Sequence, residues 1–169
     1  MPEVETVRRS LASPLIGRRI VAVRLADFPG VIGDEPLALF SARVVGRTFV
    51  AVRRRAKYLL LDLNDGAAIM VHLRMTGHLE LTPGDAPPLR FEHLAIALDN
   101  SVELRYADQR KFGRVLHLSV SALRALERRF GPEPLGAGFS AAWLGAALAR
   151  RPGKLKSVLL DQEVVAGLG

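Results

Sequence analysis

The chain has 169 residues, of which 49% are hydrophobic, and its formal net charge is +7 at pH 7. This size and composition suffice to bury a real core and are typical of an ordinary soluble globular protein of one domain, or of one domain and part of the next. The sequence contains no cysteine, which excludes disulfides and cysteine-ligated zinc within this chain.

The charge balance points to the kind of partner. Arginine accounts for 20 of the 24 basic residues, and its planar guanidinium forms two-pronged contacts with phosphate. A polyanion is therefore the expected partner, although an arginine-rich genome or thermal adaptation could produce part of the same excess. No apolar run approaches the roughly 20 residues that a membrane span needs, and residues 1–5 lack the basic start of a signal peptide. We expect a cytoplasmic protein without a membrane partner.

The first predicted elements are a short helix and a long series of strands. In the helix, Val4, Val7 and Leu11 share one stripe, with acidic residues before arginines as the helix dipole favours. β-Branched and apolar runs between glycine, proline and asparagine turns predict the strands. They cover residues 17–25, 43–55, 57–63, 67–73, 77–81, 91–98, 102–106 and 113–118. Successive short strands of this kind indicate an antiparallel β-sandwich.

The last third of the chain has helical spacing instead. Residues 121–129, 140–150 and 154–160 carry apolar side chains at helical intervals, with an Arg-Pro-Gly break before the last segment. The fold class is predicted to be α+β. We divide the chain into a β-sandwich domain at residues 1–118, a helical linker at 119–130 and a helical region at 131–169, which we expect to be incomplete.

A basic run lies at the start of one predicted strand. Arg53, Arg54, Arg55 and Lys57 are followed directly by the apolar residues of 59–63. Because a core strand has a fixed position, it can hold these cations as a patterned set of donors to phosphates. A solvated charge run is the alternative.

Two predicted loops carry side chains that can enter DNA. Arg110, Lys111 and Phe112 are consecutive in one loop, and Met75 lies in a second. An arginine and an aromatic on a loop can occupy the space left by an extruded nucleotide and bend the duplex. The alternatives are a polar hairpin with Phe112 in the core, and Met75 as core filler.

Taken together, six segments resemble those of formamidopyrimidine-DNA glycosylase, in the same order and from end to end of the chain. They read Glu-Val-Glu-Thr-Val-Arg-Arg from residue 3, Arg-Arg-Ala-Lys-Tyr-Leu-Leu from 54, His-Leu-Arg-Met-Thr-Gly from 72, Arg-Tyr-Ala-Asp-Gln-Arg-Lys-Phe-Gly from 105, Gly-Pro-Glu-Pro-Leu from 131 and Leu-Asp-Gln-Glu-Val-Val-Ala-Gly-Leu-Gly from 160. The related endonuclease VIII group is the nearest confusion.

The resemblance implies a bacterial base-excision repair enzyme, a monomer that binds double-stranded DNA with oxidised bases and is nucleoid-associated while bound. Such an enzyme finds oxidised purines, cuts the glycosidic bond and nicks the strand by elimination. The helical region resembles the first part of the family's helix-two-turn-helix. No cofactor is expected in this chain, because the family's zinc finger lies in a region that the sequence does not contain.

The resemblance also assigns roles to individual residues. Pro2 resembles the catalytic nucleophile, a secondary amine exposed by loss of Met1, and Glu3 resembles the adjacent acid. A free α-amine titrates near 8, whereas lysine titrates near 10.4, so more free base is present at neutral pH. Lys57 resembles the family's phosphate-contacting lysine on the β-sandwich, and the resemblance places it with Pro2 and Glu3 among the catalytic residues. The expected DNA-binding residues are Arg55, His72, Met75, Arg110, Lys111, Phe112 and Lys156, with Met75, Arg110 and Phe112 as the void-filling triad and Arg110 facing the orphaned cytosine.

The start of the chain departs from the family's usual Met-Pro-Glu-Leu-Pro-Glu-Val-Glu-Thr by three residues. If Pro2 and Glu3 match the first Pro-Glu, both catalytic residues are present; if they match the second, both are missing and Glu5 only begins a helix. Three residues span about 4.5 Å as helix and about 10 Å extended, and a misplacement of about 1 Å can cost on the order of 100-fold in rate. We therefore expect impaired or absent catalysis. A non-catalytic DNA-binding relative is the second hypothesis, and a sandwich serving a protein or RNA partner is the third.

Overall fold

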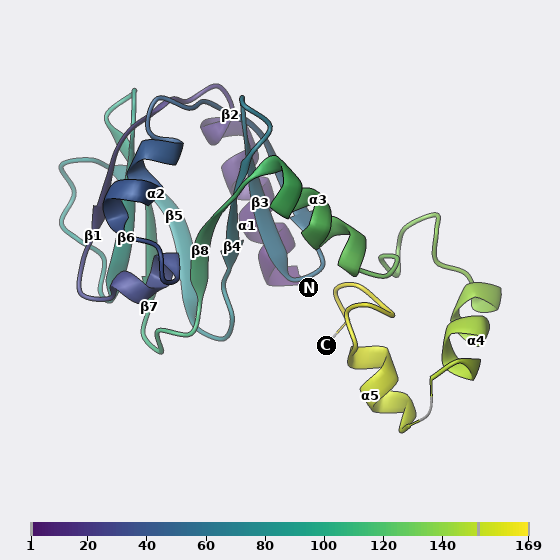
Figure 1. Cartoon of the computed structure of the whole chain (residues 1–169). Helices are drawn as coiled ribbons and strands as arrows, with labels where there is room; N and C mark the ends of the chain where they lie inside the picture. Colours follow the sequence, from purple (N-terminus) through teal and green to yellow (C-terminus); the bar gives the residue numbers. More distant parts are fainter. Residues whose placement is uncertain (1, 152, 169) are drawn as a thin grey trace.

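The computed structural model describes residues 2–151 and 153–168 of the chain, with the side chain of Pro2 outside the described part. Two four-stranded antiparallel sheets pack face to face (Figure 1). One has the order β1-β6-β7-β5, from β1 (Ile20–Leu25), β6 (Glu92–Leu98), β7 (Val102–Asp108) and β5 (Gly77–Pro83). The other has the order β2-β3-β4-β8, from β2 (Phe49–Arg55), β3 (Tyr58–Leu63), β4 (Ala68–His72) and β8 (Arg114–Leu118). The predicted α+β sandwich is confirmed.

Strand β3 is buried on both faces, which explains its unbroken leucine run. Leu59 and Leu61 point into the main core between the sheets. Leu60 points the other way, into a smaller cluster with Met70 and Leu123. Leu123 belongs to α3 (Val120–Arg129), which covers that outer face. Successive strand side chains alternate between faces, so the part of β3 that is covered on both faces, Leu59–Leu61, is apolar at every position.

The N-terminal helix α1 (Pro2–Leu15) is longer than predicted and packs along β2. Val4, Leu11 and Leu15 are buried in the main core. Their spacing places them on one side of the helix, so burial fixes both its rotation and its position along the sheet. This packing determines where the first turn of α1 lies.

The prediction of a single strand over residues 43–55 was wrong at its start. A 3-10 turn, η1 (Pro29–Ile32), and a helix, α2 (Leu37–Val44), precede β2. Phe40 and Val44 are fully buried one helical turn apart, and this packing outweighs the strand propensity of the valines. Gly46, with a φ of 83°, then turns the chain into β2.

The last part of the chain forms a small helical cluster. The helices α4 (Ala141–Ala149) and α5 (Leu155–Leu160) confirm two of the predicted helical segments, and Figure 1 shows them beyond α3. Val158, Val164 and Val165 are buried there against Trp143.

The three-part division of the chain stays a prediction. Within the described residues, no helix has the length and apolar character needed to cross a membrane.

Candidate nucleic-acid interface

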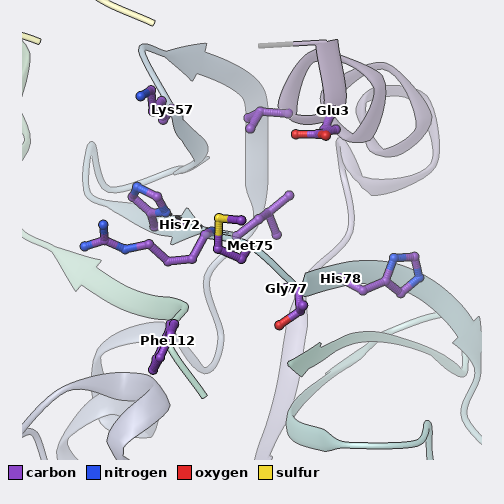
Figure 2. Close-up of a pocket in the computed structure, with 11 residues that line it drawn as sticks. Glu3, Lys57, His72, Met75, Gly77, His78 and Phe112 are labelled. Carbon is purple, nitrogen blue, oxygen red and sulfur yellow. Dashed lines mark hydrogen bonds between the residues drawn. The ribbon is translucent and has the colours of Figure 1, made fainter. Parts of the chain in front are cut away.

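A pocket of about 720 Å³ lies where four separate segments meet. Five of the predicted site residues line it: Glu3 from α1, Lys57 from the turn between β2 and β3, His72 from the end of β4, Met75 from the loop before β5, and Phe112 from the loop before β8. In Figure 2, Glu3 and Lys57 lie on one side and Phe112 on the other, with His72 and Met75 between them. The fold thus brings together residues up to 109 positions apart in the chain (112 minus 3).

The exposure of the two apolar side chains decides between core and surface. Met75 is 74% exposed and Phe112 is 53% exposed, so neither is core filler. The Arg110 guanidinium carbon lies 4.7 Å from the centre of the Phe112 ring, a cation–π distance. The three side chains of the predicted triad therefore lie at the same end of the sandwich.

Lys111 points to a neighbouring aromatic. Its backbone has a φ of 59°, the left-handed conformation that tight loops require, and its Nζ lies 5.6 Å from the centre of the Phe28 ring. Arg114 lies over the same ring, also at 5.6 Å. The basic character of this end of the sandwich thus extends past Phe112.

The turn that carries Lys57 is anchored to a distant part of the chain. Ala56 adopts a φ of 53°, and its N–H donates to Glu133 Oε1 at 2.7 Å. Arg54 donates to Glu133 Oε2 at 2.8 Å and to the carbonyl of Ala56 at 3.0 Å. Glu133 therefore holds the backbone immediately before Lys57, and its own segment is Gly-Pro-Glu-Pro-Leu.

The rest of the basic run does not fit the expectation of four free phosphate donors. Arg53 is paired with Asp62 and, at 2.7 Å, with Glu127. Its acidic partners come from β3 and α3, so the run's charge is largely used inside the molecule. Of the basic run, only Lys57 lines the pocket.

Arg55 is bound within the chain as well. Its Nη2 donates to the carbonyls of Phe130 and Gly131, both at 2.9 Å, and its side chain is 22% exposed. These contacts join β2 to the segment after α3. A DNA contact by Arg55 stays a prediction.

His72 is a neutral donor in this site. Burial, together with the charges of Arg74 and Lys57, lowers its pKa from 6.5 to about 4. Its Nδ1 accepts a hydrogen bond from the Arg74 N–H at 3.0 Å, which leaves the proton of the neutral ring on Nε2. The His72 ring packs nearly perpendicular to the Tyr58 ring, with 4.7 Å between the centroids. His72 can thus donate to a phosphate oxygen without adding charge.

Two predicted site residues lie elsewhere. The Pro2 side chain is outside the described residues, so its catalytic assignment stays a prediction. Lys156 is exposed on α5 and is not among the side chains that line the pocket. Its DNA contact also stays a prediction.

Sequence reasoning missed three residues that build the site. Glu133 supports the Lys57 turn, and Asp108 and Thr76 bond to each other between the two loops that carry Met75 and Phe112. All three fall inside the segments that carry the family resemblance. The signal was present there, but nothing in the sequence indicated which donors a carboxylate would meet.

The described residues do not fit the zinc site that the resemblance implies for the longer family members. Within this part of the chain, no three or more histidine or acidic side chains are grouped so that they could hold a metal ion. Cysteine is absent from the sequence.

Comparison with known proteins agrees with this geometry. The family pattern described as "Formamidopyrimidine-DNA glycosylase N-terminal domain" matches residues 1–115. Formamidopyrimidine-DNA glycosylases from Herpetosiphon aurantiacus and Chloroflexus aggregans are 45% and 46% identical over 169 and 172 residues, covering 100% of this chain. The chain spans 62% and 61% of the length of these two relatives.

A solved structure shows the same arrangement in three dimensions. The Lactococcus lactis enzyme, in a complex with a FAPY-dG containing DNA, matches 99% of this chain with a TM-score of 0.89 and 34% sequence identity. This chain covers 63% of that one. The sequence pattern, the curated relatives and the fold all agree, and the chain belongs to the formamidopyrimidine-DNA glycosylase family.

Proposed function

We propose that the chain binds damaged duplex DNA as the N-terminal part of a base-excision DNA glycosylase, and that oxidised purines are the lesions it recognises. The observation that carries the proposal is the convergence of Lys57, His72, Met75 and Phe112 on one pocket. Two Lactococcus lactis structures support the choice of substrate, because they are described as complexes with FAPY-dG containing DNA and with DNA containing an abasic site. We further propose that it acts as a monomer on DNA in the bacterial cytoplasm.

The side chains divide into phosphate contacts and base-stack contacts. Lys57 neutralises a phosphate, and His72 donates to one through Nε2. Met75 and Phe112 enter the stack where the damaged nucleotide leaves, and Arg110 donates to the base left opposite. Extruding a nucleotide costs a few kcal/mol, whereas full burial of one large apolar side chain contributes about 1.5–3 kcal/mol. Two such side chains offset most of the cost of extrusion.

Base excision requires the free amine of Pro2. With Met1 removed, the amine attacks the sugar C1′, the glycosidic bond breaks and the base leaves with a proton. Glu3 gives a proton to O4′ as the sugar ring opens and an iminium forms between Pro2 and C1′. The iminium acidifies C2′–H, and the Glu3 carboxylate, now ionised, takes that proton as the C3′–O bond breaks and the 3′-phosphate leaves. The position of Glu3 in the pocket lining supports this role.

One observation favours a second candidate, a family member that binds DNA without cutting it. Val4 is only 4% exposed and Leu11 only 2%, so α1 cannot slide along β2 to advance its first turn. A nucleophile that must reach further than this fixed position cannot meet C1′. In this case the base-stack contacts of Met75 and Phe112 and the phosphate contacts remain, and base release is lost.

Borohydride trapping separates the two candidates. The protein is mixed with a duplex that contains 8-oxoguanine opposite cytosine, after its intact mass has confirmed removal of Met1. A covalent protein–DNA adduct supports excision through Pro2. Absence of an adduct, together with binding that weakens steeply with salt, supports the non-cutting candidate. Binding that is indifferent to salt contradicts both.

The matched control for trapping is Glu3→Gln. This substitution keeps the size of the side chain and removes its acidity. If Glu3 supplies the proton to O4′, the yield of adduct falls while duplex binding remains unchanged. Equal adduct yields from the parent and the variant would remove Glu3 from the mechanism.

A further inference from the structure

Met75 and Phe112, which we call the wedge side chains, lie on two different loops. Met75 belongs to the loop at residues 73–76, between β4 and β5, and Arg110 and Phe112 belong to the loop at residues 109–113, between β7 and β8. We call these the wedge loops. They are 33 residues apart in sequence (109 minus 76), so their relative position is not set by the chain between them.

One carboxylate lies between the two wedge loops. Asp108 is only 1% exposed, and its Oδ1 accepts from the hydroxyl of Thr76 and, at 3.1 Å, from the N–H of Arg110. Its Oδ2 accepts from the N–H of Gly113 at 2.8 Å and from the hydroxyl of Tyr106 at 3.5 Å. Both loops are thus bonded to the same side chain.

Thr76 adds a direct link between the loops. Its Oγ1 donates to Asp108 and accepts from the N–H of Arg110 at 3.3 Å. The residue after Met75 therefore contacts the backbone of the residue that faces the orphaned base in the proposed complex. Movement of one loop without the other breaks these bonds.

The backbone of both loops packs tightly around the hydroxyl of Tyr106, next to the Asp108 carboxylate. Tyr106 is fully buried, and its hydroxyl lies 2.6 Å from where a Cβ on Gly77 would be and 1.6 Å from where a Cβ on Gly113 would be. Only glycine fits at these two positions. The bases of both loops therefore press against the same phenol oxygen.

The charge state of Asp108 matches this set of donors. Burial raises its pKa, but hydrogen bonds from Thr76, Gly113 and the backbone of the second loop outweigh burial, and the pKa lies below its usual value. An ionised carboxylate only accepts hydrogen bonds, and every partner described above is a donor. An asparagine at this position would place its NH₂ group, which is a donor, against the donors that now bond to one of the two carboxylate oxygens.

We propose that Asp108 is a positioning residue that couples the two wedge loops through Thr76, so that Met75 and the Arg110–Phe112 pair move as one unit. The inference about DNA rests on the proposed function. The coupling itself is a property of the free protein and can be measured without DNA.

Thr76→Val is the primary variant, because it removes the hydroxyl that links the loops and keeps the shape of the side chain. Thr76→Ser restores the hydroxyl and serves as the rescue. Asp108→Asn tests the carboxylate directly, and Asp85→Asn removes the same charge from an exposed loop position. A thermal unfolding curve for each variant confirms that it folds.

Hydrogen exchange in the free protein measures the coupling. In Thr76→Val, the amides of Arg110 and Gly113 are expected to exchange roughly 3- to 10-fold faster, as for the loss of one hydrogen bond. The amides of β3 remain unchanged, and Thr76→Ser restores the parent rates. Acceleration confined to residues 73–76, or equal acceleration throughout β3, would overturn the proposal, because the first shows independent loops and the second shows general destabilisation.

Fluorescence of 2-aminopurine placed opposite a tetrahydrofuran abasic analogue measures the consequence for DNA. The parent protein unstacks the probe and increases its fluorescence. Thr76→Val is expected to lose as much of this increase as Met75→Ala combined with Phe112→Ala, although it alters neither wedge side chain. A full signal from folded Thr76→Val contradicts the coupled movement. If the parent itself gives no signal, the proposed function fails, and the exchange rates still decide whether the loops are coupled.

Discussion

The guanidinium of Arg54 and the carboxylate of Glu133 lie 2.8 Å apart, although 79 positions separate them in the chain. The same carboxylate accepts the N–H of Ala56 at 2.7 Å. Lys57, the cation that we propose for phosphate binding, is therefore positioned by a residue outside the sandwich strands.

Glu133→Gln is expected to destabilise the protein by about 1–2 kcal/mol, because the side chain loses a charge-assisted hydrogen bond with Arg54 and an ion pair with Arg55 and is only 23% exposed. Urea denaturation measures the loss. Glu127→Gln is the matched control, since this more exposed partner of Arg53 is expected to contribute less than about 1 kcal/mol. Equal losses in the two variants would contradict a special role for Glu133.

Lys57→Ala is expected to weaken binding to every duplex to a similar extent. One phosphate contact contributes about 0.9 to the slope of log K against log salt concentration, so the slope falls by about that amount. A filter-binding or anisotropy titration at several salt concentrations measures it. Arg18→Ala is the control, because Arg18 pairs with Asp99 at the opposite end of the sandwich. Equal changes in slope for both variants would show that Lys57 contributes only general charge.

Phe112→Ala is expected to weaken binding to a duplex with an abasic analogue roughly 10- to 100-fold, from the lost burial of about 1.5–3 kcal/mol. Binding to an undamaged duplex changes little. The free energy of unfolding changes by no more than about 0.5 kcal/mol, the range typical of surface substitutions, since the ring is 53% exposed. The control is Val21→Ala, an exposed apolar residue on β1. Equal loss of affinity for damaged and undamaged duplexes would argue against insertion into the base stack.

His72 gives a pH dependence with a definite sign. Its pKa in the folded state, about 4, lies below the ordinary value of 6.5, so the folded state favours the neutral ring. The contribution to stability is present above pH 6.5 and is lost as the pH falls from 6.5 towards 4. Replacement by glutamine removes this part of the acid sensitivity, which is measured as the difference between two curves of unfolding free energy against pH. Parallel curves across that window would contradict the assignment.

At pH 7 the same residue carries no charge, so His72→Gln should leave the salt slope of DNA binding unchanged even if affinity falls. This result distinguishes a neutral hydrogen-bond donor from a cation. A reduction of the slope by about 0.9, the value for one phosphate contact, would show that DNA binding protonates the ring.

The sandwich and its loops could be predicted because local patterns decide them. The consecutive leucines of β3 indicate a buried strand. The spacing of apolar residues predicts α1, and the turn residues predict the wedge loops. The exchange of a strand for α2 could not be predicted, because the burial of Phe40 and Val44 is a tertiary effect.

The use of the arginines could not be predicted either. Arg53 and Arg55 look free in the sequence, yet three of their partners, Glu127, Phe130 and Gly131, lie more than 70 positions away. Whether a cation faces solvent or a carboxylate depends on long-range packing that periodicity does not report. The convergence of the wedge residues was predicted only through the family resemblance.

The two glycines against Tyr106 limit how the wedge loops can change during evolution. A Cβ on Gly77 would lie 2.3 Å from the carbonyl oxygen of Leu73, and one on Gly113 would lie 2.8 Å from that of His72. Removing the phenol oxygen would therefore not make room for alanine, because backbone atoms still occupy the space. We therefore expect tolerated substitutions in these loops to fall on the outward side chains, which change the shape of the exposed surface while the path of the backbone stays the same.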